Sequence, residues 1–343
     1  MKKIPFELHT EVYTPKDIAK VLSLAVNEKN FTGNNKGEKF LNVPVSFDIE
    51  TTSFYRDEDG ETYSYERYMK LGGKETKMEK CSLMYVWQFG INGFCIMGRT
   101  WDEFLQMLSE IVDILELCPK KRIIIYVHNL AYEFQFFREL LKWEKVFSID
   151  LRKPIYGITK TGLEFRCSYL LSGYSLAKLG EQLHTYKCEK LVGDLDYSLL
   201  RHSKTPLTQK EIGYCLNDIK VVMCYIQELL ERYKGITRLP ITKTGFVRKY
   251  CRSVCFKTTD ETGKTIPNFK YIDKIHNLNI TGMEEFAMLQ RAFSGGFTHA
   301  NAKYTDEVIE NVDSYDFTSS YPYVMVSEKF PMSTGVIVPI KSM

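Results

Sequence analysis

The first clear periodicity in the chain lies at residues 43–50, where apolar and polar positions alternate. The apolar residues Val43, Val45, Phe47 and Ile49 are separated by positions 44, 46, 48 and 50. A period of two is typical of a half-buried β-strand. Residues 123–127 (IIIYV) are apolar throughout, as in a central strand that is covered on both faces. The pattern therefore predicts one half-buried and one fully buried strand.

Turn and capping signals divide the rest of this region. The segments SLMYVWQFGI and FCIMG flank Asn92-Gly93, which predicts a tight hairpin, and residues 155–169 suggest a second hairpin around 160–162. Two capping boxes, T-x-x-E at 100–103 and at 208–211, open amphipathic helices, the second of which is expected to reach about Tyr233. Asn129 and Ser175 are expected to cap the helices LAYEFQFFRELLKW and LAKLGEQL. Strands and helices alternate, so residues 41–232 are predicted to form one α/β domain.

The flanking segments differ in character from this domain. Residues 1–40 are predicted to be an N-terminal extension with one helix near 15–26. Within the domain, residues 55–80 are charged and aperiodic and are expected to be a solvated loop. Residues 233–285 are predicted to be a basic junction, and residues 286–343 hold a glycine element and a last apolar stretch.

Composition narrows the class of protein. The chain has 343 residues, 44% hydrophobic and 26% charged, as in globular domains, and its net charge of +3 excludes a nucleic-acid protein that is basic all over. Nine scattered cysteines without a C-x-x-C pair indicate reduced thiols in an intracellular protein. No apolar run is long enough to predict a membrane span.

The positive charge is concentrated in one segment. Residues 232–257 hold eight Lys or Arg and no Asp or Glu, so the remainder of the chain is acidic overall. Arg248 and Arg252 are one helical turn apart with Lys249 beside them. We expect these three side chains to meet the phosphates of bound DNA.

Five residues on three elements are candidates for chemistry. Asp48 and Glu50 leave the same face of their strand, and Glu133 falls in the first turn of the helix after strand 123–127. Tyr214 and Asp218 are neighbours on the capped helix, away from its polar face. Taken alone, the pair on the strand could be an exposed edge face and Glu133 a partner of the helix dipole.

Four converging carboxylates and a phenol are what two hard cations need. Carboxylate oxygens hold a pair of Mg²⁺ or Mn²⁺ ions, which activate water and stabilise the leaving oxygen in phosphodiester hydrolysis. Tyr214 is then expected to orient the attacking water.

The same residues carry a family resemblance. The segments FDIETT, HNLAYEFQFF and YCLNDIK, in this order across about 170 residues, resemble the three exonuclease motifs of family B DNA polymerases, most of all the protein-primed branch of phages and organellar plasmids. The resemblance implies an RNase H-like fold, a mixed sheet flanked by helices, with 3′-to-5′ exonuclease activity. It makes Asp48, Glu50 and Asp218 metal-binding acids and Tyr214 the water-positioning residue. Glu133 stands where well-known members have Asp.

Two further elements resemble DNA-binding parts of that branch. Ser175-Leu176 is similar to a motif that contacts the single-stranded primer end, and Asn129 is similar to a residue of the second exonuclease motif with the same role. Phe293-Ser-Gly295-Gly296 resembles the Tyr-x-Gly-Gly element that joins the exonuclease and polymerase domains, where glycines let the backbone approach phosphates. From the residues alone, a plain helix cap and a plain turn remain the alternatives.

The last resemblance lies near the end of the chain. The segment from Asp316 to Pro322 (DFTSSYP) resembles polymerase motif A, in which the Asp binds Mg²⁺ and the Tyr, here Tyr321, packs under the sugar of the incoming nucleotide. Residues 317–343 contain no Asp and one Glu, so a second palm carboxylate is not expected in this chain.

The leading hypothesis is therefore the N-terminal part of a replicative, protein-primed DNA polymerase. It comprises an exonuclease domain and an incomplete palm segment that begins with motif A, and it is not expected to extend primers alone. Expected partners are a single-stranded 3′ end and primer-template DNA, and the complete enzyme is also expected to bind dNTP and a terminal protein. No membrane is expected. The expected location is the host cytoplasm for a phage protein and the mitochondrion for an organellar plasmid. The alternatives are a stand-alone RNase H-like nuclease for DNA or RNA, or a non-catalytic subunit that holds single strands or terminal protein.

Overall fold

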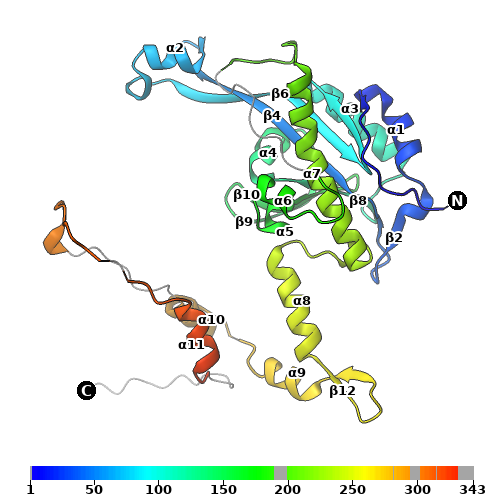
Figure 1. The fold of residues 1–343 in the computed structure, drawn as a ribbon, viewed down its shortest axis with the longest axis vertical. Coiled ribbons are helices and arrows are strands. Elements are labelled where there is room, and N and C mark those ends of the chain that lie inside the picture. The colour runs from blue at the N-terminus through cyan, green and yellow to red at the C-terminus, as the bar shows by residue number, and fades with distance from the viewer. Residues whose placement is uncertain (1, 189–198, 281, 294–301, 314, 331–343) are drawn as a thin grey trace. The chain divides into compact units, whose positions relative to one another are not determined.

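The computed structural model describes residues 2–188, 199–280, 282–293, 302–313 and 315–330 of a chain that divides into two compact units (Figure 1). The first unit is Met1–Val247 and the second is Arg248–Met343. The four predicted exonuclease acids all belong to the first unit.

A mixed sheet forms the centre of the first unit. β4 (Val45–Arg56) runs antiparallel to β6 (Glu79–Ile91) and parallel to β8 (Lys121–Val127), which is in turn parallel to β11 (Leu163–Cys167). The strand order is β1-β7-β6-β4-β8-β11-β10-β9, with β3 also paired to β8, β2 to β3, and β5 to β4. The other strands are β1 (Val12–Tyr13), β2 (Phe31–Gly33), β3 (Lys39–Leu41), β5 (Thr62–Tyr63), β7 (Phe94–Gly98), β9 (Trp143–Asp150) and β10 (Lys153–Thr159).

Helices cover both faces of this sheet. On one face lie α1 (Ile18–Ala25), α3 (Trp101–Ile114) and α4 (Leu130–Phe137), and on the other lie α5 (Ser168–Ser172), α6 (Leu176–Glu181) and α7 (Gln209–Tyr233). The side chains of β8 divide between the two: Ile123 and Ile125 pack under the first three helices, and Ile124 and Tyr126 pack with α7. The prediction of a central strand covered on both faces is confirmed.

Several local predictions are confirmed by the structure. Asn92 and Gly93 have φ values of 47° and 90° and close the β6–β7 hairpin, and a turn with Gly162 at φ 92° joins β10 to β11. At the capping boxes, the hydroxyl of Thr100 accepts a hydrogen bond from Glu103 N (3.3 Å) and that of Thr208 from Glu211 N (3.2 Å). α3 and α7 therefore begin where the motifs predicted, and α7 ends at Tyr233, as expected.

The prediction of a solvated loop at residues 55–80 is wrong. β4 and β6 continue as a two-stranded arm, and α2 (Tyr65–Lys70) lies at its tip, well away from the body of the unit (Figure 1). The ring of Tyr55 stacks on that of Tyr68 with centroids 3.6 Å apart, which ties α2 to the arm. Most side chains of the arm are exposed or half-buried, and its strands lack the alternation of apolar and polar residues that marks a half-buried strand.

The helix predicted from Leu130 to Trp143 is shorter than expected. α4 ends at Phe137, and the chain turns into β9, which the pattern did not indicate. The indole of Trp143 donates a hydrogen bond to the carbonyl of Arg138 (2.7 Å), and its ring packs against Phe134 and Phe165. These contacts of the half-buried Trp143 ring anchor the turn from α4 into β9.

The N-terminal residues take part in the sheet. β1 pairs with β7 and β3 pairs with β8, and α1, which confirms the helix expected near 15–26, packs on α3. The described residues also form short 3-10 turns, namely η1 (Pro15–Asp17), η2 (Glu28–Asn30), η3 (Gly73–Glu75), η4 (Ile236–Arg238) and η5 (Ala302–Tyr304).

The second unit consists of helices and one hairpin. α8 (Lys243–Cys255) begins in the first unit and leads to the hairpin of β12 (Lys257–Thr259) and β13 (Thr265–Pro267), followed by α9 (Phe269–His276), α10 (Met283–Ala292) and α11 (Ser320–Ser327). The described residues of 302–316 form no strand, and all of them are exposed. A strand needs a neighbour to satisfy its backbone groups. Among the helices that the structure describes, none is both long and apolar enough to span a membrane.

Candidate functional site

Three predicted acids meet between β4 and α7. Asp48, Glu50 and Asp218 each offer a carboxylate oxygen, and these oxygens all lie within 4.8 Å of one another. Asp48 and Glu50 share one face of β4 because side chains alternate along a strand, and Asp218 comes from the helix that covers this face. Glu50 and Asp218 are buried, and Asp48 is half-buried.

The contact between α7 and the sheet places Asp218 over β4. The hydroxyl of Ser46 donates a hydrogen bond to the carbonyl of Ile219 (3.0 Å), the residue after Asp218. Opposite Ser46 in β6 stands Gly90, where a Cβ atom would lie 2.7 Å from the sulfur of Met223 on α7. A glycine at this position therefore lets the helix approach the sheet closely.

Gln88 is a site residue that the sequence reasoning missed. It pairs with Asp48 in the β4–β6 register and is fully buried. Its amide nitrogen lies 3.4 Å from a carboxylate oxygen of Glu50 and 3.3 Å from the carbonyl of Cys215, as hydrogen-bond donor to both. Gln88 thus links β4, β6 and α7 beneath the acids. A polar residue in an otherwise apolar strand was the available signal, but its neighbours depend on the register.

Glu133 lies beside this group without being one of the three. It sits in the first turn of α4 and is 5% exposed, and its Oε2 has no hydrogen-bond partner among the described residues. Burial raises the pKa of Glu133 to about 8, and the charge of Glu50 adds to the effect. The hydroxyls of Thr51 and Tyr132 are hydrogen-bonded at 2.5 Å and join β4 to α4. Thr51 follows Glu50 in the sequence, and Tyr132 precedes Glu133.

The electrostatics show that the carboxylates repel one another. Burial, and then the charges of Glu50, Glu133 and Asp218, raise the pKa of Asp48 well above its ordinary value. Burial and the same acids of β4 and α7 also raise the pKa of the Cys215 thiol. Buried carboxylates that cannot all ionise together are stabilised by a nearby cation.

The donor set fits a hard divalent cation. All the ligand atoms are carboxylate oxygens, which suit Mg²⁺ and Mn²⁺, and the unpartnered Oε2 of Glu133 is a further oxygen beside the three acids. The geometry supports a divalent metal site at Asp48, Glu50 and Asp218.

Tyr214 lies one helical turn before Asp218 on α7. It is 9% exposed and packs with Tyr85 and Val86, and Val86 is the partner of Glu50 in the sheet register. The structure therefore places the phenol in the layer of the acids. Its role toward water stays a prediction.

The residues predicted to bind the 3′ end of the DNA lie at the N-termini of helices. Asn129 precedes α4 as expected, but its side chain makes no capping hydrogen bond, so the predicted capping role is wrong. Its backbone adopts the left-handed conformation (φ 79°), whereas capping residues usually have an extended backbone, and its side chain is exposed. Ser175 caps α6 as predicted, accepting a bond from Lys178 N (3.4 Å), and Leu176 packs into the core beneath.

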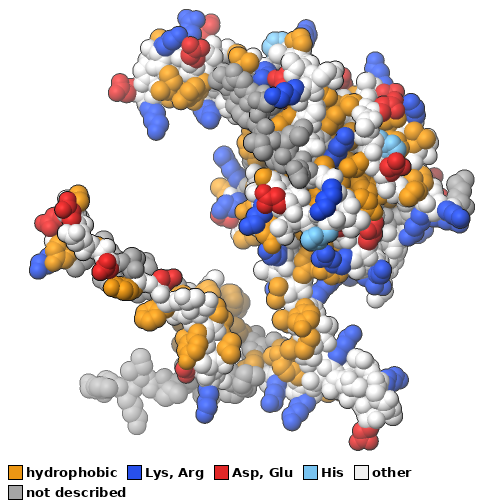
Figure 2. Space-filling view, in the orientation of Figure 1, with side chains coloured by type: hydrophobic (Ala, Val, Ile, Leu, Met, Phe, Trp, Pro, Cys, Tyr) orange, Lys and Arg blue, Asp and Glu red, His pale blue; other side chains and the backbone are white. Residues whose placement is uncertain are grey.

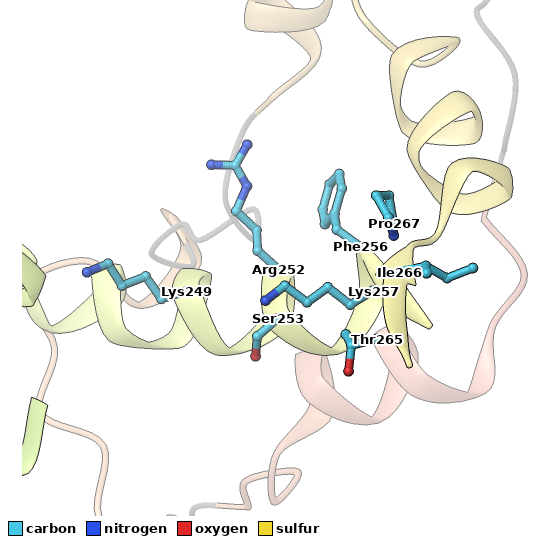
Figure 3. Close-up of a pocket in the computed structure, with 8 residues that line it drawn as sticks. All are labelled: Lys249, Arg252, Ser253, Phe256, Lys257, Thr265, Ile266 and Pro267. Atoms are coloured by element: carbon cyan, nitrogen blue, oxygen red, sulfur yellow. The ribbon is translucent and has the colours of Figure 1, made fainter. Parts of the chain in front are cut away.

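The predicted basic residues lie on the exposed surface of α8. Lys249 and Arg252 line a hollow of about 590 Å³ between α8 and the β12–β13 hairpin, whereas Arg248 does not (Figure 3). The guanidinium carbon of Arg252 lies 5.5 Å from the centroid of the Phe256 ring, and Lys257 adds a third positive charge. On the first unit, by contrast, Figure 2 shows basic and acidic side chains interspersed over the visible face.

The remaining predicted residues lie in the second unit. Phe293 follows α10 and is 90% exposed, Asp316 is exposed, and Tyr321, in α11, is 67% exposed. Gly295 and Gly296 lie outside the described residues. In the described part of the chain, Asp316 belongs to no cluster of acids that could hold a metal.

Comparison with known proteins agrees with this geometry. The family model described as DNA polymerase type B, organellar and viral, matches residues 181–341. The DNA polymerases of Bacillus phages B103 and M2 are 24% and 23% identical over 295 residues, covering 76% of this chain and 44% of theirs. The chain thus spans less than half the length of these curated relatives.

The fold agrees as well. The structure of Phi29 DNA polymerase complexed with primer-template DNA matches 79% of this chain and 42% of its own, with a TM-score of 0.50 and 16% identity. The predicted fold, an RNase H-like α/β domain with a mixed sheet flanked by helices, is confirmed. The family model, the curated relatives and the fold all show that this chain is similar to organellar and viral type B DNA polymerases.

Proposed function

We propose that the first unit is a metal-dependent 3′-to-5′ exonuclease and that the chain is the N-terminal part of a protein-primed, replicative DNA polymerase. The observation that carries the proposal is the meeting of Asp48, Glu50 and Asp218 within 4.8 Å, with Glu133 beside them. The relationship to phage DNA polymerases supports DNA as the substrate.

Each residue of the site has a part in the proposed reaction. When bound, two Mg²⁺ or Mn²⁺ ions supply positive charge that activates water and stabilises the leaving oxygen of the phosphodiester. Asp48, Glu50 and Asp218 hold these ions, Glu133 contributes a fourth carboxylate, and Gln88 keeps Glu50 in place. The hydroxyl of Tyr214 orients the attacking water.

Residues outside the cluster of acids hold the strand. Asn129, Ser175 and Leu176 contact the single-stranded 3′ end, and Arg248, Lys249 and Arg252 bind phosphates further along the DNA. In the longer protein, Phe293, Gly295 and Gly296 connect exonuclease to polymerase, and Asp316 and Tyr321 bind metal and dNTP. Primer-template DNA and a terminal protein are the partners of that longer protein, inside the host cell.

The test is degradation of a 5′-labelled single-stranded DNA by the chain in Mg²⁺ or Mn²⁺. We expect shortening from the 3′ end, and the double variant Asp48→Asn, Glu50→Gln should lower the rate by about a thousandfold, since metal charge stabilisation contributes several kcal/mol. Asp102→Asn, on the exposed surface of α3, is the matched control and should leave the rate unchanged.

Three outcomes would count against the proposal. Undiminished cleavage by the double variant contradicts the site. Faster cleavage of an otherwise identical RNA favours a stand-alone RNase H-like nuclease. Metal-independent binding of single strands without any cleavage favours a non-catalytic subunit.

A further inference from the structure

A second hollow lies in the first unit, apart from the acids. It has a volume of about 350 Å³ and opens between the loop after α5, the second half of α7 and the start of α8. We call it the aromatic pocket after its principal lining residues, which are Tyr174, Tyr225, Arg232, Tyr233, Lys243 and Phe246. Its volume falls in the range of small-ligand sites, about 300–1,000 Å³.

The aromatic rings of the pocket are partly open to solvent. The four rings of Tyr174, Tyr225, Tyr233 and Phe246 are all half-buried, and those of Tyr233 and Phe246 lie 4.8 Å apart at an angle of 31°. Half-buried rings in a basic groove are the surfaces on which unpaired bases stack, with little preference for sequence.

The charges of the pocket favour an anion. The ammonium of Lys243 lies 4.4 Å from the centroid of the Tyr174 ring, and Arg232 is exposed on α7. Neither forms an ion pair within the described part of the chain. The one acid in the lining, Glu228, accepts hydrogen bonds from the backbone nitrogens of residues 184, 185 and 186 at 2.8, 2.6 and 3.1 Å. Its charge is thus already compensated by the loop that it holds.

A glycine shapes the position of Lys243. Gly173 ends α5 with φ 72°, and a Cβ atom there would lie 2.8 Å from the Cδ of Lys243. The lysine stem can therefore cross the backbone at this position and reach Tyr174. Ser175, the predicted contact for the DNA end, is the residue that follows Tyr174.

The face of α7 that carries Asp218 leads to the pocket. Tyr225, Leu229 and Arg232 follow Asp218 by 7, 11 and 14 residues, which at ~100° per residue places all of them within ~40° of it. At ~1.5 Å per residue, the pocket begins ~10 Å from Asp218 along the helix axis and reaches ~21 Å. A strand whose 3′ end lies at the acids can cover this distance with a few nucleotides.

We propose that the aromatic pocket binds a nucleotide of single-stranded DNA a few positions upstream of the 3′ end. The base stacks on the wall formed by Tyr225, Tyr233 and Phe246, while Lys243 and Arg232 bind the adjacent phosphates. This inference rests on the proposed exonuclease function, because that function brings the 3′ end to the acids.

The test compares Lys243→Gln with Lys20→Gln. Lys20 is a matched control, since its ammonium also lies over a tyrosine ring, 5.0 Å from the centroid of Tyr13, on α1. Fluorescence anisotropy of 5′-labelled oligo(dT) in EDTA, where metal-dependent cleavage stops, measures binding of a 3-mer and a 12-mer.

We expect Lys243→Gln to weaken binding of the 12-mer by about tenfold, as for the loss of one charge-assisted contact. The slope of log K against log salt should fall by about 0.7, the value for one phosphate contact on a single strand. Binding of the 3-mer, and all binding by Lys20→Gln, should match the wild type. Phe246→Leu should also weaken binding of the 12-mer but not of the 3-mer. It should leave the slope of log K against log salt unchanged.

The contrary outcomes separate the two proposals. If the wild type degrades DNA but Lys243→Gln binds the 12-mer normally, the pocket proposal is wrong and the exonuclease proposal stands. An equal loss for the 3-mer and the 12-mer also overturns the pocket, because it places Lys243 at the 3′ end itself. A wild type that neither degrades nor binds the 12-mer overturns both.

Discussion

At the residue scale, the site is defined by carboxylates that are buried against one another. Asp48 has its pKa raised first by burial and then by three neighbouring acids, and burial raises the pKa of Glu133 to about 8. The carboxylate of Glu133 reaches this group, since its charge contributes to the raised pKa of Asp48. The longer side chain is therefore compatible with the site.

The raised pKa of Glu133 predicts a pH-dependent stability without added metal. In the folded chain Glu133 stays protonated from its ordinary value of 4.5 up to about 8, whereas it ionises in the unfolded chain. Its contribution is thus fully present below about pH 4.5 and is lost as the pH rises toward 8. The urea concentration at the unfolding midpoint, measured in EDTA, should fall as the pH rises from 5 to 8. This fall should be smaller for Glu133→Gln than for the wild type.

The control for this experiment is Glu139→Gln, an exposed acid just after α4. It should follow the wild type at every pH. Identical pH profiles for Glu133→Gln and the wild type would show that Glu133 ionises freely and does not take part in the buried group.

At the element scale, the site depends on how closely α7 packs on β4 and β6. Ser46 bonds to the backbone of α7, Gln88 bonds to it at Cys215, and Gly90 leaves room for Met223. These three residues lie on the sheet face that carries Asp48 and Glu50, since the register pairs Ser46 with Gly90 and Asp48 with Gln88. The same contacts that hold the helix therefore bring its aspartate to the strand.

This packing predicts opposite effects for two glycines. Gly90→Ala should destabilise the chain by about 1–3 kcal/mol, because the new methyl group overlaps the fully buried Met223. Gly213→Ala, in the first half of α7 where a Cβ meets no atom within 4 Å, should stabilise it by about 0.5–1 kcal/mol through helix propensity. Urea denaturation measures both, and a neutral Gly90→Ala would contradict the close approach of the helix.

At the scale of the whole molecule, the candidate exonuclease site lies in the first unit. The acids, Gln88, Tyr214 and the aromatic pocket all lie within Met1–Val247, while the basic hollow beside Lys249 and Arg252 belongs to the second unit. The first unit also contains the large sheet and its cores, so we expect it to fold by itself.

A fragment of residues 1–255, which keeps α8 whole, tests this division. It should unfold cooperatively and, like the full chain, gain stability in Mg²⁺, by about 2.7 kcal/mol at a concentration 100 times the dissociation constant. Asp218→Asn should remove most of this gain. Thermal unfolding with and without Mg²⁺ measures the effect. A gain that persists in Asp218→Asn would place the ion elsewhere, and a fragment without a cooperative transition would show that the first unit needs the second.

Much of the fold followed from local patterns. The alternation around Asp48, the capping box at Thr208 and the turn at Asn92-Gly93 each express preferences of the backbone and side chains over a few residues, and each was found where predicted. The arm at 55–80 and the early end of α4 were missed for a common reason. The pairing of the two strands of the arm and the packing of Trp143 against Phe134 and Phe165 are tertiary contacts, and such contacts leave no periodic pattern in the sequence.

The sequence by itself determined which acids this protein has, the elements that carry them and the polymerase family that their motifs resemble. Only the tertiary structure decided that Asp48, Glu50 and Asp218 meet, that Gln88 supports them and that Glu133 is buried beside them. The physical reason is that spacing along the chain sets the face of a strand or helix on which a side chain lies. The distance between two faces depends on register and on the packing of residues far apart in the chain, such as Ser46, Gly90 and Met223.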